Sequence, residues 1–175
     1  MIHLWNTFLG YIQISYPRIP WILLFACAFF ILFALLQRNN DKKRICSKAV
    51  LSLCCSFIFV LTLFNRAQGD YGFSLVPFAS YRTTLAENGV EILLQSLMNI
   101  ATYIPLGFWL PCCFPYFEKS RRVLVAVLIC SVSIELIQGF AKIGYMEIDD
   151  TLNNVAGAII GLLLYRLFVK IKSKS

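Results

Sequence analysis

Five apolar runs, each close to the length of a membrane-spanning helix, are the feature that most constrains the fold of this chain. A helix needs about 20 predominantly apolar residues to cross the hydrocarbon core of a bilayer. Of the 175 residues, 59% are hydrophobic and only 14% are charged, whereas a soluble domain carries about 25% charged residues. The runs are residues 19–36, 49–64, 92–114, 123–141 and 151–169. The sequence therefore predicts an all-α, polytopic transmembrane helix bundle of about five spans.

A single bundle accounts for nearly the whole chain, because five spans in 175 residues leave no room for a second sizeable domain. Residues 1–18 are rich in aromatic side chains and contain Pro17. We expect them to form an interfacial segment rather than a sixth span. The bundle then takes residues 19–169, and residues 170–175 form a basic tail.

The distribution of Lys and Arg predicts how the bundle is oriented. One side of the predicted bundle holds 12 of the 16 basic residues, in the loops 38–48 and 118–122 and from Arg166 onward. The other side keeps only Arg18, Arg66, Arg82 and Lys142. By the positive-inside rule, we expect the N-terminus outside and the C-terminus in the cytoplasm. Basic residues that cluster between spans also argue against a nucleic-acid partner.

Histidine and cysteine give no support for a metal centre or a cofactor. His3 is the only histidine, and the seven cysteines form no CxxC pair, so a zinc site of the usual His/Cys type is not expected. The sequence also contains no glycine-rich phosphate loop and no nucleotide fingerprint. We therefore expect no cofactor, and we interpret the cysteines as small apolar filler.

Three of the predicted spans carry polar side chains along one helical face. Residues at i, i+4 and i+7 share a face of a helix. A carboxylate inside a span costs about 2.5–3.5 kcal/mol or more, so Glu135 should face a partner or water. The three polar seams are Gln95, Asn99 and Thr102; Ser131, Glu135 and Gln138; and Asp150, Asn154 and Gly157. We expect them to meet in the outer half of the membrane as an outward-facing polar pocket, or else to serve only as hydrogen bonds between helices.

A proline interrupts the third predicted span. Pro105 has no N–H to donate to the carbonyl group of Ala101, so the helix should kink or open there. The freed carbonyl, with Asn99 and Thr102 one turn away, is then able to bind a ligand. A kink that serves only packing explains Pro105 equally well.

The densest group of polar residues precedes and begins the last span. Its acidic members are Glu147, Asp149 and Asp150. We expect one of the two aspartates to cap the last helix, and the remaining oxygens to suit a divalent cation or a cationic group of a ligand. Gly157 and Gly161 form a GxxxG pair, which permits close helix packing.

The predicted outer loop, residues 65–91, contains the apolar segment Phe73-Ser-Leu-Val-Pro-Phe78. This segment either dips back over the polar pocket or anchors the loop at the membrane interface.

Together these stretches resemble the VanZ-like family of bacterial membrane proteins, which is named for a teicoplanin-resistance protein. Residues 74–78 are similar to the family's NLxPF segment, residues 99–107 to its N-x5-P-x-G helix, residues 133–138 to its E-x-x-Q element and residues 147–157 to its D-x-x-D-x-x-x-N-x-x-G element. Ser74 stands where the family often has Asn, and Glu147 where it often has Asp. The basic residue common before the acidic element is absent around Gly144. The resemblance covers about residues 75–165 and implies a role in the cell envelope.

From the seams and the resemblance we expect a multi-pass protein of the bacterial cytoplasmic membrane that binds an amphipathic ligand. Membrane lipids, a lipid-linked envelope precursor and a lipoglycopeptide such as teicoplanin are the expected partners. The predicted ligand-binding residues are Asn99, Thr102, Pro105, Glu135, Gln138, Glu147, Asp149, Asp150 and Asn154. One alternative is a membrane-embedded enzyme acting on a lipid head group, with Glu135 and Asp150 as its acid/base pair. The other is a purely structural subunit that binds a partner protein.

Overall fold

The computed structural model describes residues 18–36, 42–64, 72–79, 81 and 89–174. The predicted interfacial segment lies outside these residues except for Arg18. The described part contains five long helices, each apolar enough to cross a membrane. They are α2 (Ile19–Leu36), α3 (Lys42–Thr62), α5 (Gly89–Cys113), α6 (Ser120–Phe140) and α7 (Ile148–Lys172). The predicted all-α architecture with five spans is confirmed.

Four of the five helices begin before the apolar runs that predicted them. Helix α2 has the predicted bounds, but α3 begins at Lys42, seven residues before the predicted span. Helix α7 continues to Lys172, so the first residues of the predicted basic tail are helical. Hydropathy marks only the part of a helix that suits hydrocarbon, whereas backbone hydrogen bonding continues into the polar interface.

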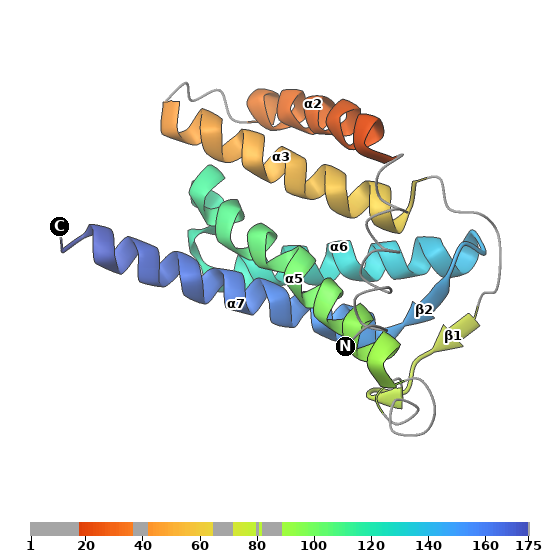
Figure 1. The fold of residues 1–175 in the computed structure, drawn as a ribbon. Helices are drawn as coiled ribbons and strands as arrows, with labels where there is room; N and C mark the ends of the chain where they lie inside the picture. Colours follow the sequence, from red (N-terminus) through yellow and green to blue (C-terminus); the bar gives the residue numbers. More distant parts are fainter. Residues whose placement is uncertain (1–17, 37–41, 65–71, 80, 82–88, 175) are drawn as a thin grey trace.

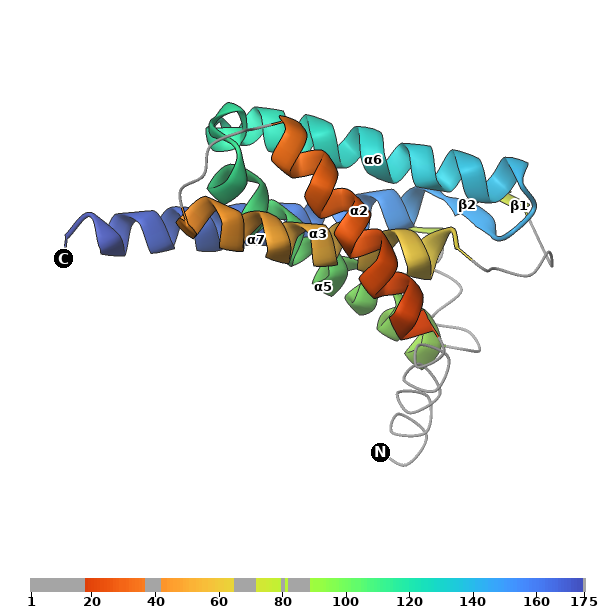
Figure 2. The ribbon, with the colours of Figure 1, turned by 90° about the horizontal axis from the view of Figure 1, so that it is seen from above.

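The axes of helices α3, α6 and α7 lie roughly along the bundle, α5 and α2 cross them obliquely, and α2 lies outermost (Figures 1 and 2). Helix α3 packs between α2 and α5, and α7 packs on both α5 and α6. A short 3-10 helix, η3 (Pro115–Glu118), turns the chain from α5 into α6.

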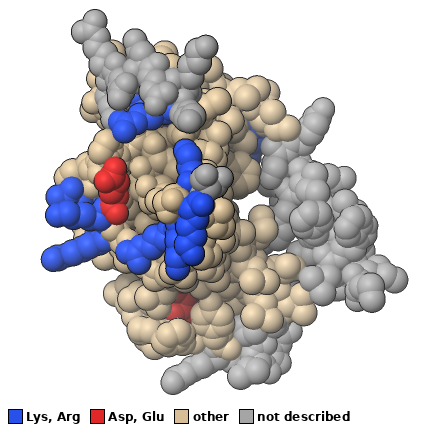
Figure 3. Space-filling view, turned by 90° about the vertical axis from the view of Figure 1, so that its left-hand side faces the viewer, with Lys and Arg blue, Asp and Glu red and all other residues tan. Residues whose placement is uncertain are grey.

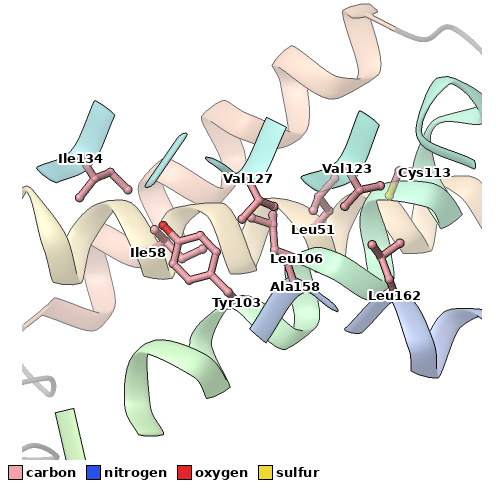
Figure 4. Close-up of a cluster of buried hydrophobic side chains, with 10 residues drawn as sticks. All are labelled: Leu51, Ile58, Tyr103, Leu106, Cys113, Val123, Val127, Ile134, Ala158 and Leu162. Carbon is pink, nitrogen blue, oxygen red and sulfur yellow. The ribbon is translucent and has the colours of Figure 1, made fainter. Parts of the chain in front are cut away.

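The buried apolar core comes from four of the five helices (Figure 4). Its members are Leu51 and Ile58 of α3; Tyr103, Leu106 and Cys113 of α5; Val123, Val127 and Ile134 of α6; and Ala158 and Leu162 of α7. Helix α2 contributes none of these residues, and Ala26 is its only buried residue. Helices α3, α5, α6 and α7 therefore form the central bundle, with α2 attached to its outside.

Helices α5 and α7 approach each other backbone to backbone. A Cβ atom added to Gly157 or Gly161 would overlap the carbonyl oxygen of Ile100 or Ile104. On the facing helix, a Cβ atom added to Gly107 would overlap the carbonyl oxygen of Ala158. The GxxxG pair therefore serves the close packing that the sequence predicts, and Gly107 matches it from the other side.

Two short strands lie at one end of the bundle. Strand β1 (Gly72–Ser74) comes from the predicted outer loop and pairs in parallel with β2 (Tyr145–Glu147), which leads from α6 into α7. Phe73 lies opposite Met146, and Ser74 lies opposite Glu147. The loop thereby brings the NLxPF-like segment beside the start of α7 (Figure 1).

Lys and Arg gather at the opposite end of the bundle, where α5 and α7 end and where α3 and α6 begin (Figure 3). The basic residues there whose side chains are described include Arg44, Lys119, Arg121, Arg122, Arg166, Lys170, Lys172 and Lys174. The structure thus separates a basic end from an end that carries the β1–β2 pair. The direction in which these ends cross the membrane stays a prediction from the positive-inside rule.

Candidate functional site

Glu135, the acidic residue inside α6, is 4% exposed and contacts the chain just before α7. Its Oε2 atom accepts a hydrogen bond of 2.8 Å from the backbone N–H of Glu147. Helix α6 ends only five residues further on, at Phe140, and β2 returns the chain to this level. The carboxylate therefore ties the last turns of α6 to the start of α7, inside the protein rather than toward lipid.

A second group of hydrogen bonds joins α6 and α7 one turn away. The Asn154 amide Nδ2 donates to Ser131 Oγ over 2.8 Å, and the hydroxyl groups of Ser131 and Thr151 lie 3.4 Å apart. All three residues are buried. Glu135 and Ser131 lie four residues apart on α6, so both polar contacts use the helical face that the sequence predicts.

Helix α5 contributes its own polar side chains to α7. Gln95 Nε2 lies 3.4 Å from Asp150 Oδ2, and the side chain of Asn99 also lies close to Asp150. This is the contact expected between the first and third polar seams. Asp150 and Glu135 are held by different partners, Gln95 of α5 for Asp150 and the Glu147 N–H for Glu135.

Gln138, the last member of the α6 seam, turns toward α3 instead of α7. Its Nε2 atom donates a 2.9 Å hydrogen bond to the backbone carbonyl of Thr62, at the end of α3. This contact extends the polar region to a fourth helix.

Asp149 and Asn153 use a second face of α7 to hold the segment that follows β1. Asp149, 2% exposed, accepts a 2.6 Å hydrogen bond from the backbone N–H of Phe78. Four residues along α7, Asn153 Oδ1 accepts a 2.8 Å hydrogen bond from the Tyr81 hydroxyl.

The prediction that one of the aspartates caps α7 is wrong, because the N-cap residue is Glu147, which makes no capping hydrogen bond through its side chain. Asp149 lies in the first turn of α7 and anchors the neighbouring segment.

Two predicted ligand-binding residues of α5, Thr102 and Pro105, show no side-chain hydrogen bond to α6 or α7 among the described residues. The Thr102 hydroxyl donates a 2.7 Å hydrogen bond to the carbonyl of Met98 in its own helix. Pro105 is half-buried within α5, which continues past it and past Pro111 to Cys113.

The structure adds four residues to the predicted set: Ser131, Thr151, Asn153 and Tyr81. Ser131 belongs to a predicted seam, and Asn153 precedes Asn154 in the acidic stretch. Tyr81 gives no comparable signal, because its partner is 72 residues away in the sequence.

Several buried polar atoms of this region have hydrogen-bonding capacity that the described residues leave unused. Asn153 Nδ2 and Asn154 Oδ1 are two of them, and Asn99 Nδ2 and Tyr103 Oη also lack a well-formed hydrogen bond, although they lie close to Asp150 and Ser131. The Tyr103 ring extends from α5 into the core formed with α3 and α6 (Figure 4). Buried polar groups in folded proteins are nearly always paired with protein or water, so these atoms are donors and acceptors that water or another molecule would satisfy.

The acidic side chains before and at the start of α7 are not grouped as a cation site. Among the described residues, no group of three or more His, Cys, Asp or Glu side chains is arranged to hold a metal ion. Glu147, Asp149 and Asp150 follow one another in the sequence, but Asp149 faces Phe78 while Asp150 faces Gln95.

Comparison with known proteins agrees with the resemblance of the motifs. The family model described as VanZ/LLP1 matches residues 20–169, which include all five described helices except the first residue of α2 and the last three of α7. No curated protein and no solved structure matches the chain. With the polar seams, the NLxPF-like segment and the acidic stretch all inside the matched region, this multi-pass membrane protein belongs to the VanZ-like family.

Proposed function

We propose that this VanZ-like protein binds an amphipathic envelope molecule, with the polar head group at the site where α5, α6 and α7 meet. The observation that supports the proposal is the group of buried polar atoms with unused hydrogen-bonding capacity, which includes Asn153 Nδ2 and Asn154 Oδ1. Polar seams that only held helices together would pair with one another, because an unpaired buried donor or acceptor costs about 1–3 kcal/mol.

The chemistry of the site favours a head group that donates hydrogen bonds or carries positive charge. The carboxylates of Glu135 and Asp150 are acceptors, and the neighbouring amides both donate and accept. Asp150 is half-buried, whereas Glu135 is 4% exposed, so Asp150 is the more accessible of these two carboxylates to an amine or a hydroxyl group. Ammonium and sugar hydroxyl groups of lipid-linked precursors and of lipoglycopeptides fit this donor and acceptor set.

The outer surface of the same helices suits the apolar part of such a ligand. Leu93 and Leu97 of α5 are 48% and 59% exposed, and they lie within one turn of Gln95 and Asn99. An acyl chain along these side chains would remain in hydrocarbon while its head group reached the polar site. A role in teicoplanin tolerance follows if the bound molecule is the lipoglycopeptide or its cellular target.

Binding by the purified full chain in detergent tests this proposal directly. The probes are teicoplanin, vancomycin as a glycopeptide without the lipid tail, and an undecaprenyl-linked precursor, each followed by native mass spectrometry. We expect a lipid-bearing probe to bind and Asn99→Ala, Glu135→Gln and Asp150→Asn each to weaken binding at least tenfold. Ser133→Ala is the matched control, since its exposed hydroxyl bonds only to Ile129 of its own helix.

The same variants give a cellular test in a sensitive Gram-positive host. We expect the wild type to raise teicoplanin tolerance and the three site variants to lose it at equal membrane levels, while Ser133→Ala behaves as wild type. Binding of no lipid-bearing probe by folded wild-type protein would contradict the proposal.

A further inference from the structure

Strand β1 and the segment that follows it expose several apolar side chains outside the five spans. Phe73, Leu75, Val76 and Phe78 are each 58–61% exposed, and Pro77 between them is also exposed. Soluble surfaces rarely show such a contiguous apolar patch unless it has a partner. We call residues 73–78 the apolar wedge.

The apolar wedge is held in a defined conformation by the polar face of α7. The Phe78 N–H donates to the buried carboxylate of Asp149, and Phe78 adopts φ 63°, a backbone conformation that aromatic residues rarely take. The Ala79 N–H closes a turn onto the Val76 carbonyl at 3.2 Å. The Phe78 N–H therefore faces the protein while the apolar side chains of the segment are exposed.

The apolar wedge lies at the level where the spans begin. Its anchor Asp149 is the second residue of α7, and Figure 1 shows β1 running from the far end of α6 back toward the first turns of α5 and α7. At its other end, the Phe73 ring lies 6.5 Å from the ring of Phe140, the last residue of α6, which is 75% exposed. The apolar wedge thus continues the lipid-facing surface of α6.

We propose that the apolar wedge inserts into the bilayer, in the leaflet at the end of the bundle away from the basic residues. Aromatic and aliphatic side chains at the start of a hydrocarbon region are stabilised by the boundary between acyl chains and head groups. Asp149 is the positioning residue, because it satisfies the Phe78 N–H that would otherwise enter this apolar boundary unpaired.

Site-specific photocrosslinking in phospholipid nanodiscs tests the insertion. The full chain would carry p-benzoylphenylalanine at the position of Val76, of Ile137 as a lipid-facing control on α6, or of Lys142 as an exposed control outside the helices. We expect position 76 to form phospholipid adducts at least half as efficiently as position 137 and at least threefold more efficiently than position 142. Plain phospholipid is the only probe, so the result does not depend on the ligand of the proposed function.

A second comparison tests the anchor with position 76 labelled. Asp149→Asn keeps an oxygen acceptor and should keep the adduct yield, whereas Asp149→Ala should lower the yield at position 76 at least threefold and leave position 137 unchanged. The proposal is overturned if position 76 crosslinks mainly to a second copy of the chain, or if its lipid yield is no higher than that of position 142. An unchanged yield in Asp149→Ala would overturn the anchoring role.

Discussion

Helix pair α2–α3 and helix pair α5–α7 meet the same requirement, contact between apolar helices, in different ways. In the first pair, aromatic rings fill the interface: the Phe25 ring lies 4.8 Å from that of Phe59 and 5.2 Å from that of Phe64. In the second pair, glycines bring the two backbones into direct contact, as at Gly107 and Gly161. Side chains can repack around a change, but two touching backbones cannot.

This difference coincides with the position of the polar site. The polar side chains of Asp150 and Asn154 continue the α7 stripe that Gly157 and Gly161 occupy further along the helix. Close packing of α5 on α7 therefore fixes the spacing between Asp150 and Asn99, whereas α2 packs chiefly on α3. Rigidity is concentrated where the head group would bind.

The largest effect should come from adding a side chain to the backbone contact. We expect Gly161→Val to lower the free energy of unfolding by about 3 kcal/mol or more, because the new atoms overlap Ile104 and Phe108 of α5. Unfolding of the purified protein by SDS in mixed micelles measures the change.

Gly139→Ala is the control for this glycine effect. A Cβ atom at Gly139 would lie 3.2 Å from the Phe73 ring and 3.3 Å from the Met146 Cβ, so neighbouring side chains can adjust. We expect a clearly smaller loss, and equal losses in both variants would show that the backbone contact is not special.

Removing the carboxylate that joins α6 to α7 should have the next largest effect. Glu135→Ala leaves the Glu147 N–H without its acceptor, which we expect to cost about 1–3 kcal/mol. Glu135→Gln keeps an oxygen acceptor and should be less destabilised. Hydrogen exchange at the Glu147 amide provides a local readout: fast exchange in the alanine variant alone supports the bond, and unchanged exchange in both variants argues against it.

A change in the aromatic interface should cost less. We expect Phe25→Leu to lower the free energy of unfolding by about 1 kcal/mol, because the ring contacts with Phe59 and Phe64 are lost while an apolar side chain remains. Leu23→Ala is the control. Leu23 of α2 is 56% exposed, so this substitution should change stability little. A loss as large as that of Gly161→Val would remove the contrast between the two helix pairs.

The smallest effect should follow Thr102→Val. The Thr102 hydroxyl bonds to Met98 of the same helix, so we expect a change within about 0.5 kcal/mol in stability and no change in probe binding. Loss of binding by a stable Thr102→Val variant would instead make this residue a ligand contact, as its place in the α5 seam predicts.

The helices and the seams could be predicted from the sequence because each depends on a local pattern. Hydropathy located the five spans, and the i, i+4 spacing placed Ser131 and Glu135 on the face of α6 that meets α7. The start of α3 was not predictable from hydropathy, since the residues after Lys42 are basic.

The contacts of the loop depend on pairings that leave little trace in the sequence. Strands β1 and β2 have three residues each and pair although α5 and α6 lie between them in the sequence. The hydrogen bond from Gln138 ends on a backbone carbonyl, at Thr62, and every residue has such a group. The adjacent residues Asp149 and Asp150 point to different faces of α7, and the sequence does not indicate which face meets Phe78 and which meets Gln95.

The parallel pairing of β1 with β2 also constrains the order in which the protein can be completed during translation. Strand β1 leaves the ribosome before α5 and α6, but its partner strand follows both of them. The segment after β1 must therefore wait, unpaired, until two more spans have entered the membrane. Phe78 gains its hydrogen bond only when Asp149 arrives. The polar end of the bundle is consequently finished last, by the same residues that begin the final helix.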